Sequence, residues 1–174
     1  MFRYCPVCAG PNIQFLEGKC WKCPDCGMIY YHNTAAACGA LIEMGDAGIL
    51  LLRRGKEPAA GKLDLPGGFA DPGEGIVEAL RRECAEEIGW EPPEESITFL
   101  ASFANVYPYK DFMYNTCDSF FTVHAPAGFS LSSLKLQESE IAEAAVVRHG
   151  CINYDDIAFP SAKKALRYYY DNRH

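Results

Sequence analysis

Short apolar segments separated by turn-forming residues dominate the chain beyond the first thirty or so residues. Segment 48–54 (GILLLRR) is an aliphatic run of strand length, which predicts a buried strand. Segments 97–109 (ITFLASFANVYPY) and 116–125 (TCDSFFTVHA) are rich in aromatic and β-branched residues and predict two more strands. Weaker patterns indicate strands near 63–65 and 144–148. These segments together predict a sheet.

Two segments have the pattern of helices. At about 100° per residue, segment 75–88 gathers its apolar side chains into a stripe about 80° wide, which can face the sheet. Gly89 then stands where a glycine commonly ends a helix. Segment 159–174 predicts a final helix that begins near Pro160 or Ser161. The apolar stripe of the first helix consists of Val77, Leu80, Cys84 and Ile88.

The order and size of these elements indicate the fold class. Strands and helices interleave without a regular βαβ rhythm, which predicts an α/β fold with a mixed sheet and helices packed on it. The chain has 174 residues, of which 49% are hydrophobic and 13% aromatic. That composition supports a sizeable core in one domain, with room for a small appendage.

Charge and hydropathy exclude some classes of function. No apolar run has the roughly 20 residues that span a bilayer, and the start lacks the apolar stretch of a signal peptide, so we expect a cytoplasmic protein. The net charge of −7 argues against a broad basic surface for nucleic acid. It is compatible with a phosphate-bearing substrate, because divalent cations can lie between acidic side chains and phosphate.

The nine cysteines include two CxxC pairs near the start of the chain. Cys5 and Cys8 form one pair, and Cys23 and Cys26 form the other after a separation of fourteen residues. This spacing is typical of a zinc ribbon, in which four thiolates surround Zn²⁺ and metal binding supplies the folding energy. Cys20 leaves the assignment open, because Cys20 and Cys23 also form a CxxC pair.

We expect segment 1–34 to be the zinc ribbon and segment 35–174 to be the main domain. The ribbon carries three basic and two acidic residues, which favours a structural or dimerisation role over a grip on nucleic acid. A homodimer is therefore an open alternative. The alternative to a zinc site is a set of free thiols in a reducing environment. Four other cysteines lie in apolar contexts and are expected to be small buried residues: Cys38, Cys84, Cys117 and Cys151.

Three carboxylates crowd together on the predicted helix 75–88. Glu83, Glu86 and Glu87 fall within an arc about 100° wide next to the apolar stripe. Like charges at these spacings destabilise a helix by roughly 0.2–0.5 kcal/mol per pair, unless a cation offsets the repulsion. Hard cations such as Mg²⁺ and Mn²⁺ prefer oxygen ligands. Arg82 can pair with a carboxylate and orient it. A solvated acidic helix is the alternative.

The residues around these carboxylates form a longer motif that resembles the Nudix box, G-x5-E-x7-R-E-U-x-E-E-x-G-U, where U is a bulky apolar residue. Every fixed letter is present at its spacing, and Cys84 and Trp90 occupy the U positions. The motif consists of Gly68, five residues, Glu74, seven residues and then the run Arg82-Glu83-Cys84-Ala85-Glu86-Glu87-Ile88-Gly89-Trp90. The chain is thus similar to the Nudix hydrolase superfamily with an N-terminal zinc ribbon.

The resemblance implies an α/β/α sandwich around a mixed sheet and hydrolysis of a nucleoside diphosphate linked to another group, X. It also implies that Mg²⁺ or Mn²⁺ is held by Glu83 and Glu87, with Glu86 in the same cluster and the carbonyl of Gly67 beside them. Arg82 and Glu74 take supporting roles. The general base is a box glutamate or a glutamate of a later loop. The later candidates are Glu138, Glu140 and Glu143, of which we favour Glu140 because it directly precedes a strand pattern at 142–147.

A zinc ribbon ahead of the box is similar to the NADH pyrophosphatase and ADP-ribose pyrophosphatase branches. The S-Q-P-W-W run that the NADH pyrophosphatase branch carries downstream does not occur here, which argues against NADH as the preferred substrate. ADP-ribose or a dinucleotide-like compound is the first expectation. Three alternatives remain: a nucleotide-sensing module without turnover, a nucleic-acid protein acting on capped RNA, and a nucleoside triphosphate pyrophosphatase.

Substrate contacts are less readable. Arg53 and Arg54 follow the buried strand 48–54, where they can meet phosphate or serve as ordinary strand-end charges. The aromatic residues downstream of the box could stack on a base, although most are expected in the core or an interface. These residues are Phe103, Tyr107, Tyr109, Phe112 and Tyr114.

Overall fold

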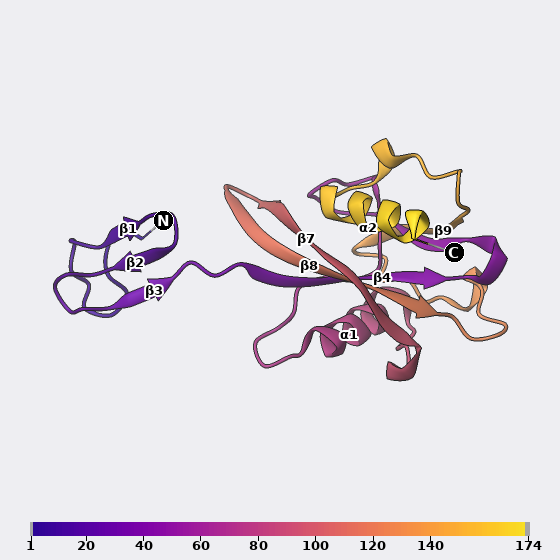
Figure 1. The fold of residues 1–174 in the computed structure, drawn as a ribbon, viewed down its shortest axis with the longest axis horizontal. Coiled ribbons are helices and arrows are strands. Elements are labelled where there is room, and N and C mark those ends of the chain that lie inside the picture. The colour runs from indigo at the N-terminus through magenta and orange to yellow at the C-terminus, as the bar shows by residue number, and fades with distance from the viewer. Residues whose placement is uncertain (1, 173–174) are drawn as a thin grey trace. The chain divides into compact units, whose positions relative to one another are not determined.

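The chain forms two compact units in the computed structural model, which describes residues 2–172 (Figure 1). The small unit extends to Thr34, and the large unit begins at Ala35. Among the described residues, no helix combines the length and the apolar character that a membrane span requires.

The small unit is a three-stranded antiparallel sheet in the order β1-β2-β3 within residues 2–34. Tight turns follow two of its cysteines: Ala9 N–H donates to the carbonyl of Cys5 (2.8 Å), and Gly27 N–H donates to that of Cys23 (2.9 Å). Each turn folds the second cysteine of its pair back towards the first. The strands are β1 (Gln14–Leu16), β2 (Cys20–Lys22) and β3 (Ile29–Tyr31).

The large unit is built on a six-stranded mixed sheet within residues 35–172. Its strands follow the order β6-β5-β4-β8-β7, and β9 also pairs with β5. The β4–β8 pair is parallel, whereas the other pairs are antiparallel, so the sheet is mixed as expected. The strands are β4 (Ala35–Glu43), β5 (Ile49–Arg54), β6 (Leu63–Asp64), β7 (Ile97–Tyr109), β8 (Phe112–His124) and β9 (Ile141–Val147).

Two α-helices cover this sheet within the described residues. Helices α1 (Ile76–Ile88) and α2 (Pro160–Asp171) lie on opposite faces of the sheet (Figure 1). This arrangement confirms the α/β/α sandwich. Short 3₁₀ helices also occur between residues 35 and 172: η1 (Gly45–Ala47), η2 (Glu94–Ser96), η3 (Leu131–Ser133) and η4 (Tyr154–Asp156).

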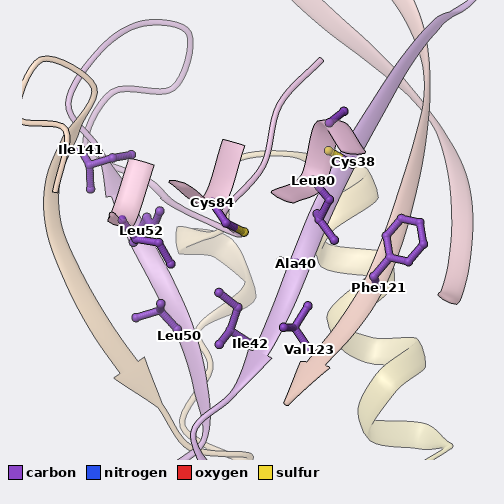
Figure 2. Close-up of a cluster of buried hydrophobic side chains, with 12 residues drawn as sticks. Cys38, Ala40, Ile42, Leu50, Leu52, Leu80, Cys84, Phe121, Val123 and Ile141 are labelled. Atoms are coloured by element: carbon purple, nitrogen blue, oxygen red, sulfur yellow. The ribbon is translucent and has the colours of Figure 1, made fainter. Parts of the chain in front are cut away.

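Each face of the sheet has its own hydrophobic core. Because successive side chains of a strand point to opposite faces, β5 directs Leu50 and Leu52 towards α1, and Ile49 and Leu51 towards α2. Figure 2 shows the α1-side cluster, in which side chains of β4 and β5 gather with Leu80 and Cys84. The aliphatic run 48–54 is thus continuous because both of its faces are buried.

The helix predictions match the structure closely. Helix α1 begins after Gly75 and ends before Gly89, which has the left-handed φ of 69°. Of the predicted apolar stripe, Val77 is only half-buried, and Ala79 is buried in addition. Helix α2 begins at Pro160, as predicted.

Other expectations need correction. The sequence did not identify β4 as a strand, although it lies at the centre of the sheet. Strand β8 begins at Phe112, four residues earlier than predicted. Cys38 and Cys84 are buried as expected, but Cys117 and Cys151 are exposed. On β8, the strand alternation turns Cys117 away from the face that buries Thr116 and Asp118. Cys151 lies in the loop after β9.

The α1-side core should contribute strongly to the stability of the large unit. Replacement of the fully buried Leu80 by alanine should lower the free energy of unfolding by about 2–5 kcal/mol, because it removes apolar contacts and leaves a cavity. Urea unfolding followed by far-UV circular dichroism measures the effect. Leu131→Ala is the matched control: its side chain is 42% exposed, and the change should stay within about 0.5 kcal/mol. Equal destabilisation by both variants would contradict this description of the core.

Candidate active site and metal centres

A cavity of about 360 Å³ lies in the large unit, within the range of small-ligand sites. Glu83, Glu86 and Glu87 line it from α1, and Gly67 and Gly68 line it from the loop before that helix. Residues of β4, β5, β6, β7, β8 and the start of α2, together with Lys56 and Glu140, line other parts of it. We call this space the acidic cavity. The structure thus brings the three crowded carboxylates together on one wall of a ligand-sized space.

Arg82 is the centre of the charge network beside the cavity. Its guanidinium donates to both carboxylate oxygens of Glu74 (2.7 and 3.0 Å) and to Glu83 Oε1 (2.9 Å). It also donates to the carbonyl of Phe69 (3.0 Å) and, more weakly, to Glu86 Oε2 (3.4 Å). The bond from Arg82 lowers the pKa of the Glu74 carboxyl. Arg82 thereby fixes helix, loop and carboxylates relative to one another.

The two glycines ahead of α1 allow the loop to approach the acidic residues. Gly67 N–H donates to Glu87 Oε2 (2.9 Å), and Gly67 adopts a φ of 143°, a conformation that L side chains rarely adopt. A Cβ atom on Gly68 would lie 2.5 Å from the carboxylate of Glu83. Strand β4 holds the loop in place, because Cys38 N–H donates to the carbonyl of Gly68 (2.8 Å).

Burial makes it costly to keep the carboxylates ionised. It raises the pKa of Glu87 to about 8, against the lowering effect of the Gly67 N–H bond, and the charge of Glu83 adds to the rise. Burial also raises the pKa of Glu83, with Arg82 opposing it. A divalent cation would favour the ionised forms of both groups, and carboxylate oxygens are the donors that hard cations prefer.

The carboxylate oxygens of the three box glutamates are not arranged around one common metal position. In residues 2–172, Glu83, Glu86 and Glu87 do not form a group whose ligand atoms all lie within 4.8 Å of one another. Glu83 and Glu86 bond to Arg82 instead, and Glu87 bonds to Gly67. The donor chemistry of the three carboxylates nevertheless fits a divalent cation.

Among the later glutamates, Glu140 lies at the cavity. It lines the acidic cavity and forms an ion pair with Lys56, which lines the cavity as well. Glu138 and Glu143 are not part of the lining, and Glu143 pairs with Arg53 (3.1 Å). The charge of Glu140 contributes to the raised pKa values of Glu83 and Glu87, which reflects its closeness to them.

The two arginines at the end of β5 take different positions. Arg53 does not line the cavity: it pairs with Glu143 and donates to the carbonyl of Gly61 (2.7 Å). Arg54 lines the cavity, but its charge is paired with Asp64 (3.2 Å). Burial raises the pKa of Asp64 to about 6, and Arg54 opposes the rise.

The aromatic residues downstream of the box are also divided. Tyr107 is the one of the five that lines the acidic cavity. Phe103 packs against the α2-side core, and Phe112 is exposed. A second space of about 360 Å³, which we call the apolar hollow, shares Phe69 and Tyr107 with the acidic cavity. Its lining consists of Ala35, Phe69, Tyr107, Tyr109 and Tyr114.

Sequence reasoning missed the buried polar part of the cavity lining. Asn105 of β7, Thr116 and Asp118 of β8, and Ser161 of α2 line the acidic cavity and are buried. Their signal was weak but present: Thr116 and Asp118 are polar residues two positions apart, next to apolar positions of the same strand. Polar residues on the buried face of a strand commonly mark a site, because burial without a partner is unfavourable.

The small unit brings four thiols together. The Sγ atoms of Cys5, Cys8, Cys23 and Cys26 all lie within 4.8 Å of one another, and this group does not include Cys20. The Cys5–Cys26 and Cys8–Cys23 sulfur pairs are each 3.7 Å apart. Four sulfurs placed tetrahedrally about 2.3 Å from a zinc ion would be about 3.8 Å apart. The thiol group therefore fits a tetrahedral metal ion.

Comparisons with known proteins agree with the fold and the motif. The NUDIX domain family model matches residues 32–171. NAD-capped RNA hydrolase NudC from Chromobacterium violaceum is 36% identical over 87 residues, which cover 50% of this chain and 32% of that protein. Human NAD(P)H pyrophosphatase NUDT13, mitochondrial, is 34% identical over 100 residues, which cover 58% of this chain and 27% of that protein.

The chain thus spans about a third of the length of the curated relatives that it matches. A crystal structure of a NUDIX hydrolase from Nitrosomonas europaea has a TM-score of 0.68 at 24% identity, covering 99% of this chain and 93% of that chain. This likeness shows the fold. Because the family model covers most of the sequence, the chain belongs to the NUDIX domain family.

Proposed function

We propose that the chain is a metal-dependent hydrolase that cleaves the pyrophosphate bond of a nucleoside diphosphate linked to X. One observation carries the proposal: three glutamates of the Nudix box line a ligand-sized cavity, and Arg82 fixes two of them. Water adds to one phosphorus, the P–O–P bond breaks, and a mononucleotide and phosphorylated X leave.

The roles of the residues follow from their contacts. Glu83, Glu86 and Glu87 would hold the divalent cation, Mg²⁺ or Mn²⁺, which supplies positive charge against the diphosphate. Arg82 and Glu74 orient the carboxylates. The carbonyl of Gly67, which lies in the lining loop beside Glu87, would be a further ligand. Glu140, next to these groups, would accept the proton of the attacking water.

ADP-ribose or a dinucleotide-like compound is the proposed substrate. The apolar hollow beside the acidic cavity suits a planar base, because its aromatic rings offer faces for stacking. The matched relatives include an NAD-capped RNA hydrolase and an NAD(P)H pyrophosphatase, whose named substrates contain a dinucleotide diphosphate. Capped RNA is the second candidate, and the net charge of −7 favours a compact substrate over a long nucleic acid.

Substitution of the metal-binding glutamates tests the proposal. Glu83→Gln and Glu87→Gln should each lower turnover by at least about 100-fold, because each removes a charged ligand of the cation. The measurement is hydrolysis of ADP-ribose, NADH, NAD, NAD-capped RNA, diadenosine polyphosphates, nucleotide sugars and deoxynucleoside triphosphates, with Mg²⁺ or Mn²⁺.

Glu78→Gln is the matched control on the same helix. Glu78 accepts a bond from Gly75 N–H at the start of α1, and glutamine retains this cap, so activity should stay unchanged. Full activity in both Glu83→Gln and Glu87→Gln would refute the metal-binding role. Cleavage of no compound by the folded wild-type protein would refute the proposed hydrolase.

The general base is tested separately. Glu140→Gln should lower kcat by about 100-fold or more while Mn²⁺ affinity, measured by calorimetry, stays within a few-fold, because proton transfer is lost and the metal ligands remain. Glu138→Gln and Glu143→Gln are controls, since neither side chain lines the cavity. Retained kcat in Glu140→Gln would assign proton transfer to another group.

The four-thiol group of the small unit is proposed to hold structural zinc. Native mass spectrometry should find one zinc ion per chain in the wild-type protein and in Cys20→Ser, and none in Cys23→Ser. Chelation should also change the fluorescence of the buried Trp21, because metal binding stabilises this small unit. Loss of zinc from Cys20→Ser, with retention in Cys23→Ser, would overturn the ligand assignment.

A further inference from the structure

Three buried polar oxygens on one wall of the acidic cavity have no hydrogen-bond partner in the part of the chain that the structure describes. They are Asn105 Oδ1, Thr116 Oγ1 and Asp118 Oδ1. The three residues are only 9%, 2% and 8% exposed, respectively. We call them the polar triad. Buried polar groups are nearly always hydrogen-bonded, so three unmet oxygens in one place need an explanation.

The strands bring the polar triad together. Asn105 of β7 is the antiparallel partner of Thr116 of β8, which places their side chains next to each other on the same face. Asp118 lies two residues further along β8 and so points to that face as well. All three line the cavity that Glu83 and Glu87 line from α1. A molecule in this cavity can therefore meet both groups.

Asp118 is held in a fixed orientation. The hydroxyl of Ser161, in the first turn of α2, donates to Asp118 Oδ2 at 2.6 Å. This bond leaves Oδ1 as the unmet oxygen. The basic side chains that line the cavity are paired with carboxylates: Arg54 with Asp64 (3.2 Å), Lys56 with Glu140, and Arg82 with Glu74 (2.7 Å). The unmet oxygens accept no hydrogen bond from any of them.

The chemistry of the polar triad selects its ligand. The carboxylate and amide oxygens accept hydrogen bonds, and the Thr116 hydroxyl both donates and accepts. A phosphate carries no donor when fully ionised and would be repelled by Asp118. A sugar hydroxyl can donate to a carboxylate or amide oxygen and accept from a threonine hydroxyl at the same time. An adjacent pair of such hydroxyls would meet several of these oxygens.

We propose that Asn105, Thr116 and Asp118 form a subsite that binds the sugar hydroxyls of the substrate. The proposal rests on the proposed function for the position of the diphosphate at the glutamates. Asn105, Thr116 and Asp118 would then determine specificity by selecting substrates that carry a neutral, hydroxyl-bearing group beside the diphosphate. The ribose of the nucleoside and a sugar in X offer the same chemistry, and substrate analogues can distinguish them.

The test compares ADP-ribose with three analogues, with Mg²⁺ present. Butyl-ADP lacks the sugar of X, the 2′,3′-dideoxyadenosine analogue of ADP-ribose lacks the hydroxyls of the nucleoside, and IDP-ribose replaces the amino group of the base. The wild-type enzyme should prefer ADP-ribose over one of the first two by at least about tenfold in kcat/KM. Thr116→Val and Asp118→Asn should remove most of that preference through KM, and should change kcat/KM for the disfavoured analogue by less than about twofold.

The variants and their control preserve shape. Valine matches threonine in size, and asparagine retains an oxygen that can accept from Ser161. Thr122→Val changes the same residue type further along β8, where Thr122 bonds to the carbonyl of Thr98 (3.4 Å) and does not line the cavity. This control should keep the wild-type preference. Equal loss of kcat/KM for every substrate in Thr116→Val and Asp118→Asn would indicate a structural role and overturn the subsite. A preference for ADP-ribose over IDP-ribose that disappears in these variants would assign the polar triad to the base amino group instead.

Binding of the non-hydrolysable α,β-methylene analogue of ADP-ribose, measured by calorimetry, separates the subsite from the hydrolase. If the wild-type protein cleaves nothing but binds this analogue, and Thr116→Val weakens binding at least about tenfold, the subsite stands and the hydrolase proposal fails. If the wild-type enzyme cleaves ADP-ribose and the preference survives in both variants, the subsite fails alone. Absence of both cleavage and binding would overturn both proposals.

Discussion

The arrangement of the acidic cavity depends on the hydrogen bonds and ion pairs that the guanidinium of Arg82 forms. Three carboxylates within five residues of one helix repel one another, and α1 tolerates them because a fixed positive charge lies among them. The same group reaches the Phe69 carbonyl and Glu74, so the loop that carries Gly67 and Gly68 is tied to the helix. Lysine has one nitrogen and could not serve these separate acceptors together. Charge neutralisation and loop position therefore come from one side chain.

On strand β8, the residues that pack in the hydrophobic cores and the polar residues that line the acidic cavity lie at different ends. Towards its end, β8 contributes Phe120, Phe121 and Val123 to the two cores, and towards its start the buried face carries Thr116 and Asp118. The two helices pack on the apolar end of β8, one on each face of the sheet. The hydrophobic cores therefore do not need apolar side chains at positions 116 and 118. Residues of the site can therefore change with limited effect on the cores that hold the fold together.

Much of this arrangement could be predicted from sequence, because helix periodicity and the box spacing are local. The ends of α1 and its carboxylate arc followed from the periodicity, and the sandwich was implied by the resemblance that the box spacing carries. Strand β4 was missed because AAACGALIE lacks β-branched residues at its start, and Gly39 is needed there, since a Cβ atom would lie 2.8 Å from the ring of Phe120. Strand alternation also shows that Arg53 and Arg54 face opposite ways, so at most one could reach the cavity. The polar triad depends on the pairing of residues 105 and 116, which local pattern does not reveal.

The acidic cavity lacks two things that a ligand can supply: positive charge at the glutamates and hydrogen-bond donors at the polar triad. Together these two needs restrict which molecules can bind there. The glutamate wall favours positive charge, because burial and mutual repulsion raise the pKa values of Glu83 and Glu87. The polar triad offers neutral and anionic acceptors that need hydrogen-bond donors. A cation with inorganic phosphate would supply only the positive charge, and an uncharged sugar would supply only the hydrogen-bond donors. A diphosphate that carries both a cation and a hydroxyl-bearing group meets both, so binding at each wall should strengthen binding at the other.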